Sequence, residues 1–199
     1  MKTLSLNILD IVQNSIRAEA GTITIGIEES AATDLYTIKV TDNGKGIPAG
    51  IVDSVTDPFV TTRTRRRMGL GLALLKFHAC MAEGDLKITS TEGEGTEVTA
   101  TFRYGHIDRQ PLGDIAGVMM ILVGGNPGRE FIYSHTTDRG SYIFSTREIR
   151  EVLECEILSG ASLLNDLREM IDSNLKEIQA SGLQDEKVIK VLGLKKEIE

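Results

Sequence analysis

The chain has 199 residues, of which 41% are hydrophobic, and this is enough apolar material for the core of one large domain or two small ones. Its formal net charge of −7 argues against broad nucleic-acid binding, which needs a positive surface that displaces counterions from phosphates. Its cysteines, Cys80 and Cys155, lie far apart without the spacing of a zinc site, so neither a disulfide scaffold nor a structural metal centre is expected.

Hydropathy also argues against a membrane protein. The longest strongly apolar run, Ile115 to Val123, is too short to span a bilayer. The first four residues lead directly into a patterned helix, without the apolar segment of a signal peptide. We therefore expect a cytoplasmic protein that has no membrane segment.

The first predicted element is a helix from Leu4 to Ala20. Its apolar residues recur every three or four positions, at Leu6, Leu9, Val12 and Ile16. Asp10, Asn14 and Arg17 share another face within two turns. A weak surface pair would account for Asp10 and Arg17, but Asn14 is a poor helix former placed among apolar neighbours. Asn14 is therefore a candidate functional residue.

Two strands follow, Thr22 to Glu28 and Leu35 to Thr41, because apolar and polar residues alternate in both. The second strand leads directly into the sequence Asp-Asn-Gly-Lys-Gly-Ile at residues 42–47. A strand end presents a side chain rigidly, and glycines let the backbone approach a ligand or turn at positive φ. This pattern favours a pocket floor at Asp42, although Asp-Asn-Gly is equally common in ordinary turns.

A second helix is expected from Gly69 to about Glu83. Before it, residues 49–55 are expected to form one or two helical turns, and residues 56–68 a mobile, basic loop. A helix start offers unpaired N–H groups and the positive end of a dipole, which favours contact with an anion. The nearby arginines fit this hypothesis or a solvated charge run, and they are Arg63, Arg65, Arg66 and Arg67.

The next two strands are predicted at Asp85 to Thr91 and Thr96 to Arg103. The intervening Glu-Gly-Glu-Gly sequence is typical of a hairpin turn. Helix, two strands, helix and two strands in this order are not βαβ repeats. We therefore expect an α+β fold, a two-layer α/β sandwich with a mixed sheet and helices on one face.

These motifs resemble those of the GHKL superfamily of DNA gyrases, Hsp90 chaperones, histidine kinases and MutL proteins. The matching segments occur in the family's order: Asp10–Ala18 resembles the N box, Asp42–Gly46 the G1 box, Asp57–Arg63 the F box and start of the ATP lid, and Gly69–Leu72 the G2 box. Gly95 and Thr96 resemble the last nucleotide-contacting pair. The resemblance covers about half the chain and implies a Bergerat-type ATP-binding fold.

The resemblance implies ATP and Mg²⁺ as cofactors. Asp42 would accept the adenine amino group, and Asn14 would bind the magnesium that bridges the phosphates, as suits a hard cation that prefers oxygen. Asp10 is the catalytic candidate. The implied nucleotide-binding residues are Asn14, Arg17, Asp42, Gly44, Gly46, Ile47, Phe59, Thr62, Arg63, Gly69, Leu70, Gly71, Leu72 and Thr96.

Two departures from the family pattern bear on activity. Family ATPases usually place Glu four residues before the magnesium Asn, whereas this chain has the shorter Asp10, which implies slow or absent turnover. Arg17 leans toward the kinase branch, but only nine residues precede Asp10, so a phosphoacceptor hairpin is not expected there. We interpret the three histidines, His78, His106 and His135, as structural or surface residues.

The second half resembles no family and lacks catalytic spacing. Residues 104–114 are expected to form a boundary between an ATP-binding domain, 1–104, and an α+β partner-coupling module, 105–199, that ends in amphipathic helices. The predicted elements are a hairpin of Ile115–Val123 and Arg129–His135, a strand at Ser141–Ser145, a helix at Thr146–Leu153 capped by Thr146, and a helix at Ala161–Ala180. The apolar stripe of the last helix favours packing on its own domain over a dimer seam.

Together these features predict a nucleotide-dependent regulatory protein, a Mg-ATP-binding histidine-kinase-like ATPase. Two alternatives stay open: a Ser/Thr protein kinase of the anti-sigma-factor type that acts in trans, and a pseudo-enzyme that only binds ATP. A protein partner is expected, and a homodimer is left open.

Overall fold

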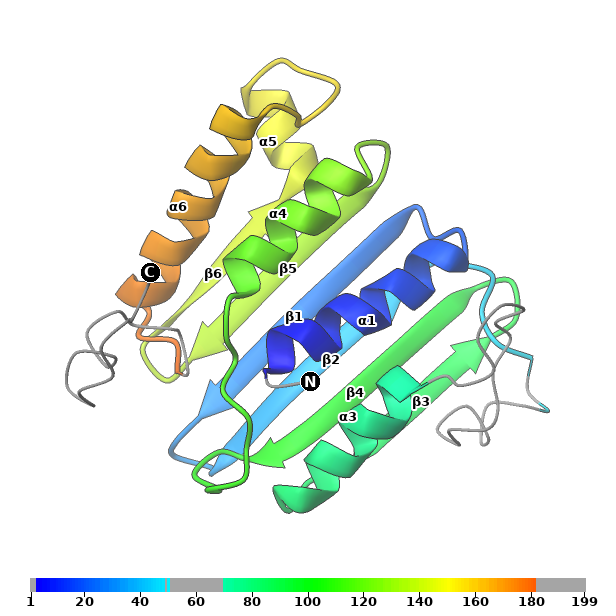
Figure 1. Ribbon diagram of the computed structural model, residues 1–199, viewed down its shortest axis with the longest axis vertical. Coiled ribbons are helices and arrows are strands. Elements are labelled where there is room, and N and C mark those ends of the chain that lie inside the picture. The colour runs from blue at the N-terminus through cyan, green and yellow to red at the C-terminus, as the bar shows by residue number, and fades with distance from the viewer. Residues whose placement is uncertain (1–2, 49, 51–69, 182–199) are drawn as a thin grey trace, which may run out of the picture.

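The computed structural model describes residues 3–48, 50 and 70–181 and has two layers (Figure 1). Its elements are α1 (Leu4–Arg17), β1 (Thr22–Ser30), β2 (Leu35–Asp42), α3 (Leu70–Met81), β3 (Leu86–Thr91), β4 (Gly95–Arg103), α4 (Ile115–Gly125), β5 (Glu130–Thr137), β6 (Gly140–Ser145), α5 (Thr146–Val152) and α6 (Ala161–Glu177). Helices α1, α3, α4 and α6 cover one face of the sheet. The predicted α+β class is confirmed.

The six strands form one mixed sheet in the order β3-β4-β2-β1-β5-β6. All neighbouring strands are antiparallel except β1 and β5, which are parallel. The predicted β3–β4 hairpin is confirmed, with Thr91 opposite Gly95. Strands from both predicted domains therefore belong to one sheet, and the division at residues 104 and 105 stays a prediction.

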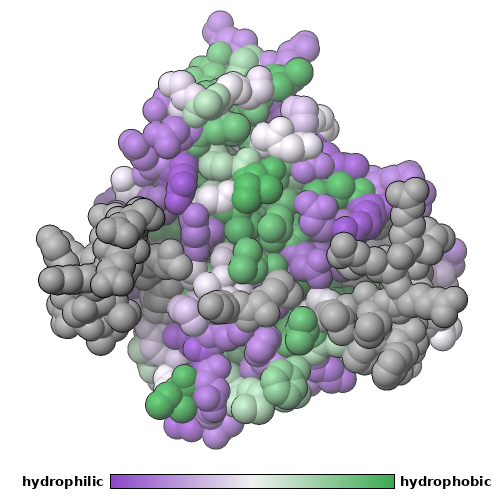
Figure 2. Space-filling view, viewed as in Figure 1, coloured by the Kyte–Doolittle hydropathy of each residue, from purple (hydrophilic) through white to green (hydrophobic). Residues whose placement is uncertain are grey.

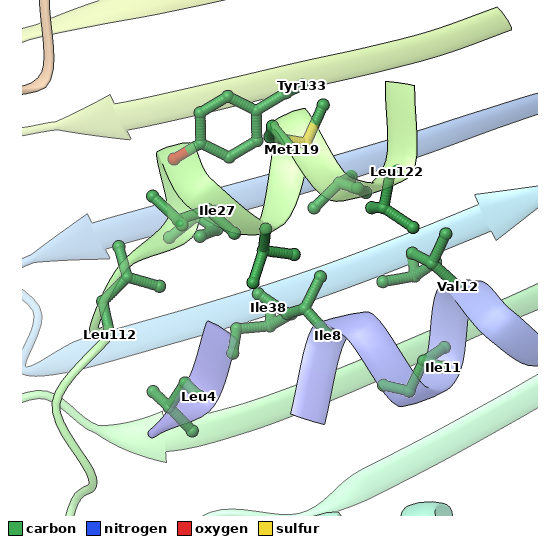
Figure 3. Packing of buried hydrophobic residues seen from close by; sticks show 14 of the residues in the cluster. Leu4, Ile8, Ile11, Val12, Ile27, Ile38, Leu112, Met119, Leu122 and Tyr133 are labelled. Carbon is green, nitrogen blue, oxygen red and sulfur yellow. The ribbon is translucent and has the colours of Figure 1, made fainter. Parts of the chain in front are cut away.

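One hydrophobic core lies between the sheet and the helices (Figure 3). Alternation along β1 and β2 buries one face of each strand, as the sequence predicts. In α1 the buried stripe is Leu4, Ile8, Ile11 and Val12. Of the predicted stripe, Val12 is buried and Leu9 and Ile16 pack against the core, whereas Leu6 is 42% exposed. Figure 2 shows that the helical face of the molecule exposes apolar residues among its polar ones.

Residues 115–123, predicted as a strand, instead form helix α4, so that prediction is wrong. A continuous apolar run does not distinguish a strand from a buried helix by periodicity. The deciding local signal is Asp114, whose Oδ1 accepts a hydrogen bond from the Gly117 amide at 2.7 Å and caps the helix. The connection at residues 126–129 therefore joins a helix to β5 and does not form a hairpin turn.

The C-terminal helices follow the prediction more closely. Ser145, rather than Thr146, caps α5, because its hydroxyl accepts a hydrogen bond from the Glu148 amide at 3.3 Å. The Thr146 hydroxyl instead accepts one from the Phe131 amide at 2.9 Å. Helix α6 packs on α4 through buried leucine and isoleucine side chains, which confirms the expected packing within the chain.

A contact from β5 to α1 joins the two halves further. Arg129, which immediately precedes β5, donates from its guanidinium to the carbonyl oxygens of Ala20 and, at 3.3 Å, Ile16. Ile16 lies in the last turn of α1, where a basic side chain can bond the last carbonyls, and Ala20 lies three residues beyond the helix. The arginine therefore acts as a C-terminal cap supplied from the second half of the chain.

Alanine substitutions in α4 test the helix against the predicted strand. Met119 is fully buried, whereas Ile121 is 60% exposed, although a strand would place both on one face. We expect Met119→Ala to lower the free energy of unfolding by about 2–5 kcal/mol and Ile121→Ala by less than about 0.5 kcal/mol. Urea unfolding of both variants checks this, and similar losses would contradict the helix.

Candidate functional site

Asp42 lies at the end of β2, opposite Thr96 of β4, and its carboxylate is fixed by two donors. Oδ2 accepts a hydrogen bond from the Ser15 hydroxyl at 2.6 Å, and Oδ1 accepts one from the Gly44 amide at 2.9 Å. Ser15 is a buried residue of α1, next to Asn14. Each carboxylate oxygen keeps a second lone pair, so the oriented acid can still accept an amino group.

The glycine turn after Asp42 is wedged between protein backbones. A Cβ at Gly44 would lie 2.7 Å from the Ala18 carbonyl oxygen, and one at Gly46 would lie 2.1 Å from the Thr91 carbonyl oxygen. Gly46 also has a φ of +67°, which favours glycine. The Lys45 amide donates to the Ala18 carbonyl at 2.8 Å. These glycines are therefore needed for close approach of the turn to α1 and the β3–β4 hairpin.

Ser90 of β3 closes the other side of this turn. Its hydroxyl accepts a hydrogen bond from the Ile47 amide at 2.8 Å and donates to the Gly95 carbonyl at 2.8 Å. The Thr96 hydroxyl lies 2.9 Å away and, because the single Ser90 proton is used on Gly95, acts as the donor to Ser90. Thr96 and Ile47 are thus brought together through a residue that the sequence analysis missed.

Ser15 and Ser90 share a signal that sequence patterns do contain. Each is a polar residue on the core-facing side of its element. Ser15 lies one helical turn after Val12, and Ser90 lies on the same face of β3 as Leu86 and Ile88. Polar groups at inward positions need hydrogen-bond partners. The sequence does not show which partner each serine takes, because that depends on strand pairing and on how α1 lies across the sheet.

Asn14 and Arg17 interact on the outer side of α1. The Asn14 side-chain oxygen accepts a hydrogen bond from the Arg17 guanidinium at 2.9 Å, and Arg17 is exposed. A neutral amide oxygen suits Mg²⁺, which binds through few protein ligands and takes the rest from phosphates and water. Within residues 3–48, 50 and 70–181, no group of three or more His, Cys, Asp or Glu side chains forms a separate metal site.

Asp10 contacts the start of α3. A Cβ at Gly71 would lie 1.7 Å from Asp10 Oδ2, so glycine leaves the space that the carboxylate occupies. Gly71 is the second residue of α3, where the helix dipole is positive and favours a negative charge. The acid of the first predicted motif and the glycine of the fourth therefore meet, and Leu72 packs on the core beside them.

Several predicted elements lie outside the described residues. These are the short helix at 49–55, the basic loop with its lid, and the site residues Phe59, Thr62, Arg63 and Gly69. Their roles stay predictions, as does that of Leu70, with which α3 begins.

Comparison with known proteins identifies the family. Residues 2–106, just over half of the chain, match the model of the "Histidine kinase-, DNA gyrase B-, and HSP90-like ATPase" domain. The chain belongs to this ATPase family. The chain is 38% identical over 96 residues to sporulation kinase D of Bacillus subtilis, a match that covers 47% of the chain and 18% of the kinase. It is 37% identical over 102 residues to the sensor histidine kinase WalK of the same organism, covering 48% and 17%.

A further relative is the "Non-motile and phage-resistance protein" of Caulobacter vibrioides, 34% identical over 112 residues, which are 52% of this chain and 13% of the relative. The chain thus spans under a fifth of the length of these relatives. The crystal structure of the N-terminal domain of a DNA repair protein has a TM-score of 0.51 at 19% identity, covering 73% of this chain and 53% of that one. This likeness supports the fold alone.

Among the residues that the structure describes, every helix is too short or too polar to cross a bilayer. The cytoplasmic location expected from the sequence stays a prediction.

The need for glycine in the turn after Asp42 can be tested with two alanine variants. Gly46→Ala should lower the free energy of unfolding by about 1–3 kcal/mol, because alanine disfavours the positive φ and its Cβ collides with the Thr91 carbonyl. Gly125→Ala, at the last residue of α4, should have little effect, since a Cβ there meets nothing within 4 Å among the described residues. Thermal unfolding of the two variants checks this. Equal losses would mean that the turn does not need a glycine at Gly46.

Proposed function

We propose that this protein is a Mg-ATP-binding regulatory ATPase. The observation that supports it is the Asp42 carboxylate, oriented by the Ser15 hydroxyl and the Gly44 amide at a strand end. A carboxylate accepts hydrogen bonds only, so it favours a base with an exocyclic amino donor, which adenine has. The family membership supports ATP as the nucleotide.

The remaining roles follow from the residues beside Asp42. Asn14 would bind the magnesium, and Arg17, which is exposed and already within hydrogen-bond distance of Asn14, would contact the phosphates. The bound metal would supply positive charge that stabilises the phosphates during transfer. Asp10 would orient an attacking nucleophile and accept its proton, with its position fixed against Gly71.

Protein phosphorylation is a second candidate function. Two of the relatives are named as kinases, and the chain matches only part of each. A kinase that acts in trans, on a histidine or on a Ser or Thr of the anti-sigma-factor type, would pass the phosphoryl group to another protein. Incubation with γ-labelled ATP and host lysate distinguishes transfer from hydrolysis, because transfer leaves the label on protein. The protein partner and a homodimer stay predictions.

Adenine selection is tested at Asp42. We expect Asp42→Asn to lose a charge-assisted hydrogen bond worth about 1.5–3 kcal/mol, which weakens ATP binding about 10- to 100-fold. Calorimetric titration with ATP measures this. Asp108→Asn, at an exposed loop carboxylate, is the control and should bind like the wild type. Unchanged affinity in a folded Asp42→Asn protein would remove Asp42 from the site.

Turnover is tested at Asp10. Since general-base assistance contributes about 10²- to 10⁴-fold, Asp10→Asn should slow single-turnover ATP hydrolysis by a factor in that range. ATP affinity should stay near the wild-type value, because Asn14 and Asp42 are intact. Gly71→Ala should also slow hydrolysis, since its Cβ displaces the carboxylate. If wild type and Asp10→Asn react at equal rates, Asp10 is not a base and the ATP-binding pseudo-enzyme becomes the preferred function.

A further inference from the structure

A second polar cluster lies at the opposite end of β1 from the candidate site. Asp42 is paired with Ile23 near the start of β1, whereas Glu29 lies near its end, paired with Tyr36. Glu29 points into the core and is only 5% exposed. A buried carboxylate is costly unless hydrogen bonds compensate its charge, so its partners show what holds this part of the fold together.

Two residues donate three hydrogen bonds to Glu29. His135 Nε2 donates to Oε1 at 2.8 Å, and the Ser181 amide donates to the same oxygen at 2.8 Å. The Ser181 hydroxyl donates to Oε2. Burial acts to raise the pKa of Glu29, but these bonds outweigh it, and the pKa is lowered from its ordinary value. Glu29 is therefore ionised at neutral pH.

The His135 side of the cluster is rigid. His135 is fully buried in β5, and its Nδ1 is 2.7 Å from the Tyr133 hydroxyl, within the same strand. Both residues are fixed by the pairing of β5 with β1 and β6. This partner of Glu29 cannot leave without disrupting the sheet.

Ser181, in contrast to His135, lies outside the sheet. Ser181 lies four residues after Glu177, the last residue of α6, in a turn of residues 178–181 that we call the C-terminal turn. Besides Ser181, the turn is held by the Thr137 hydroxyl, which donates to the Ile178 carbonyl at 2.6 Å, and by the buried side chains of Ile178 and Ala180. Two of the three bonds to Glu29 therefore come from one residue in an irregular segment, and both break if that segment moves.

We propose that Glu29 is a clasp for the C-terminal turn, which makes this turn a strap with a closed and an open state. In the closed state Ser181 satisfies the buried carboxylate and covers the end of β1. In the open state the carboxylate keeps only His135 and is exposed to water through the gap that the turn leaves. Because the two Ser181 bonds form and break together, intermediate positions of the turn are disfavoured.

Neighbouring polar groups support a site that can rearrange. The Tyr36 hydroxyl, cross-strand from Glu29, is buried and has no hydrogen-bond partner among the described residues. The same holds for the Tyr142 hydroxyl of β6, whose residue pairs with His135. The Arg109 guanidinium lies 4.6 Å from the Tyr36 ring centroid. Buried polar groups without partners are rare in native proteins and each needs an explanation, and a second hydrogen-bond arrangement beside Glu29 supplies one for these hydroxyls.

Hydrogen exchange tests the clasp without nucleotide, so its outcome is independent of the proposed ATPase activity. The Ser181 amide donates to Glu29 in the closed turn, whereas the amides of residues 178–180 donate to carbonyls of α6. In Glu29→Gln we expect the Ser181 amide to exchange about 10- to 100-fold faster than in the wild type, because its charge-assisted bond is weakened. Amides of β4 serve as the internal reference and should not change. Glu28→Gln, at the exposed neighbour of Glu29, is the matched control.

Ser181→Ala provides the second variant, because it removes one donor and leaves the buried carboxylate in place. It should also speed exchange in the C-terminal turn, and in a Glu29→Gln background it should add little. If Glu29→Gln also speeds exchange in β4, that substitution has destabilised the whole fold. Ser181→Ala is then the variant that tests the clasp. The clasp is overturned if the turn of folded Glu29→Gln exchanges as slowly as in the wild type. Where Ser181→Ala decides, the same result in that variant overturns the clasp.

Discussion

The candidate site depends on the two hydrogen bonds that fix the Asp42 carboxylate. One comes from Ser15 of α1 and the other from the Gly44 amide in the turn that follows β2. A helix and a turn that are distant in sequence are thereby fixed to the same acid, so the position of Asn14 relative to Asp42 is set by the fold. Binding through preorganised groups requires little ordering of side chains when a ligand arrives.

Local patterns predict much of this arrangement. Alternating apolar residues predict β1 to β4, and apolar residues at helical spacing predict α1, α3 and α6. Each of these elements buries one face, so its apolar residues recur with the period of a strand or of a helix. The same reasoning fails for α4, whose residues are apolar on all sides. The burial of α4 against α6 depends on tertiary packing, which the local pattern does not show. In the sequence, only the Asp114 cap distinguishes this segment from a strand.

Candidate site residues can be recognised in the sequence where the residue type carries the signal, and not where the structural partner carries it. Asp42, with its glycine turn, carries its signal in sequence. Ser15 and Ser90 acquire their roles only when α1 and β3 approach the turn. The sequence suggested a surface pair of Asp10 with Arg17, whereas the structure places Asp10 against Gly71 and pairs Arg17 with Asn14. Long-range packing brings Asp10 to Gly71, whereas the pair of Arg17 and Asn14 follows from their spacing of three residues along one helix.

The Arg129 cap on α1 has a consequence for how this fold is divided. The arginine lies outside the family-matched residues 2–106, yet it satisfies carbonyls at the end of the helix that carries Asp10 and Asn14. β5 likewise covers an edge of β1 that would otherwise be open. A fragment that ended at residue 106 would expose the unpaired edge of β1, which could pair with other chains, and would leave the end of α1 without its arginine contact. The part of the chain that matches the family is therefore smaller than the part whose strands and helices stabilise one another.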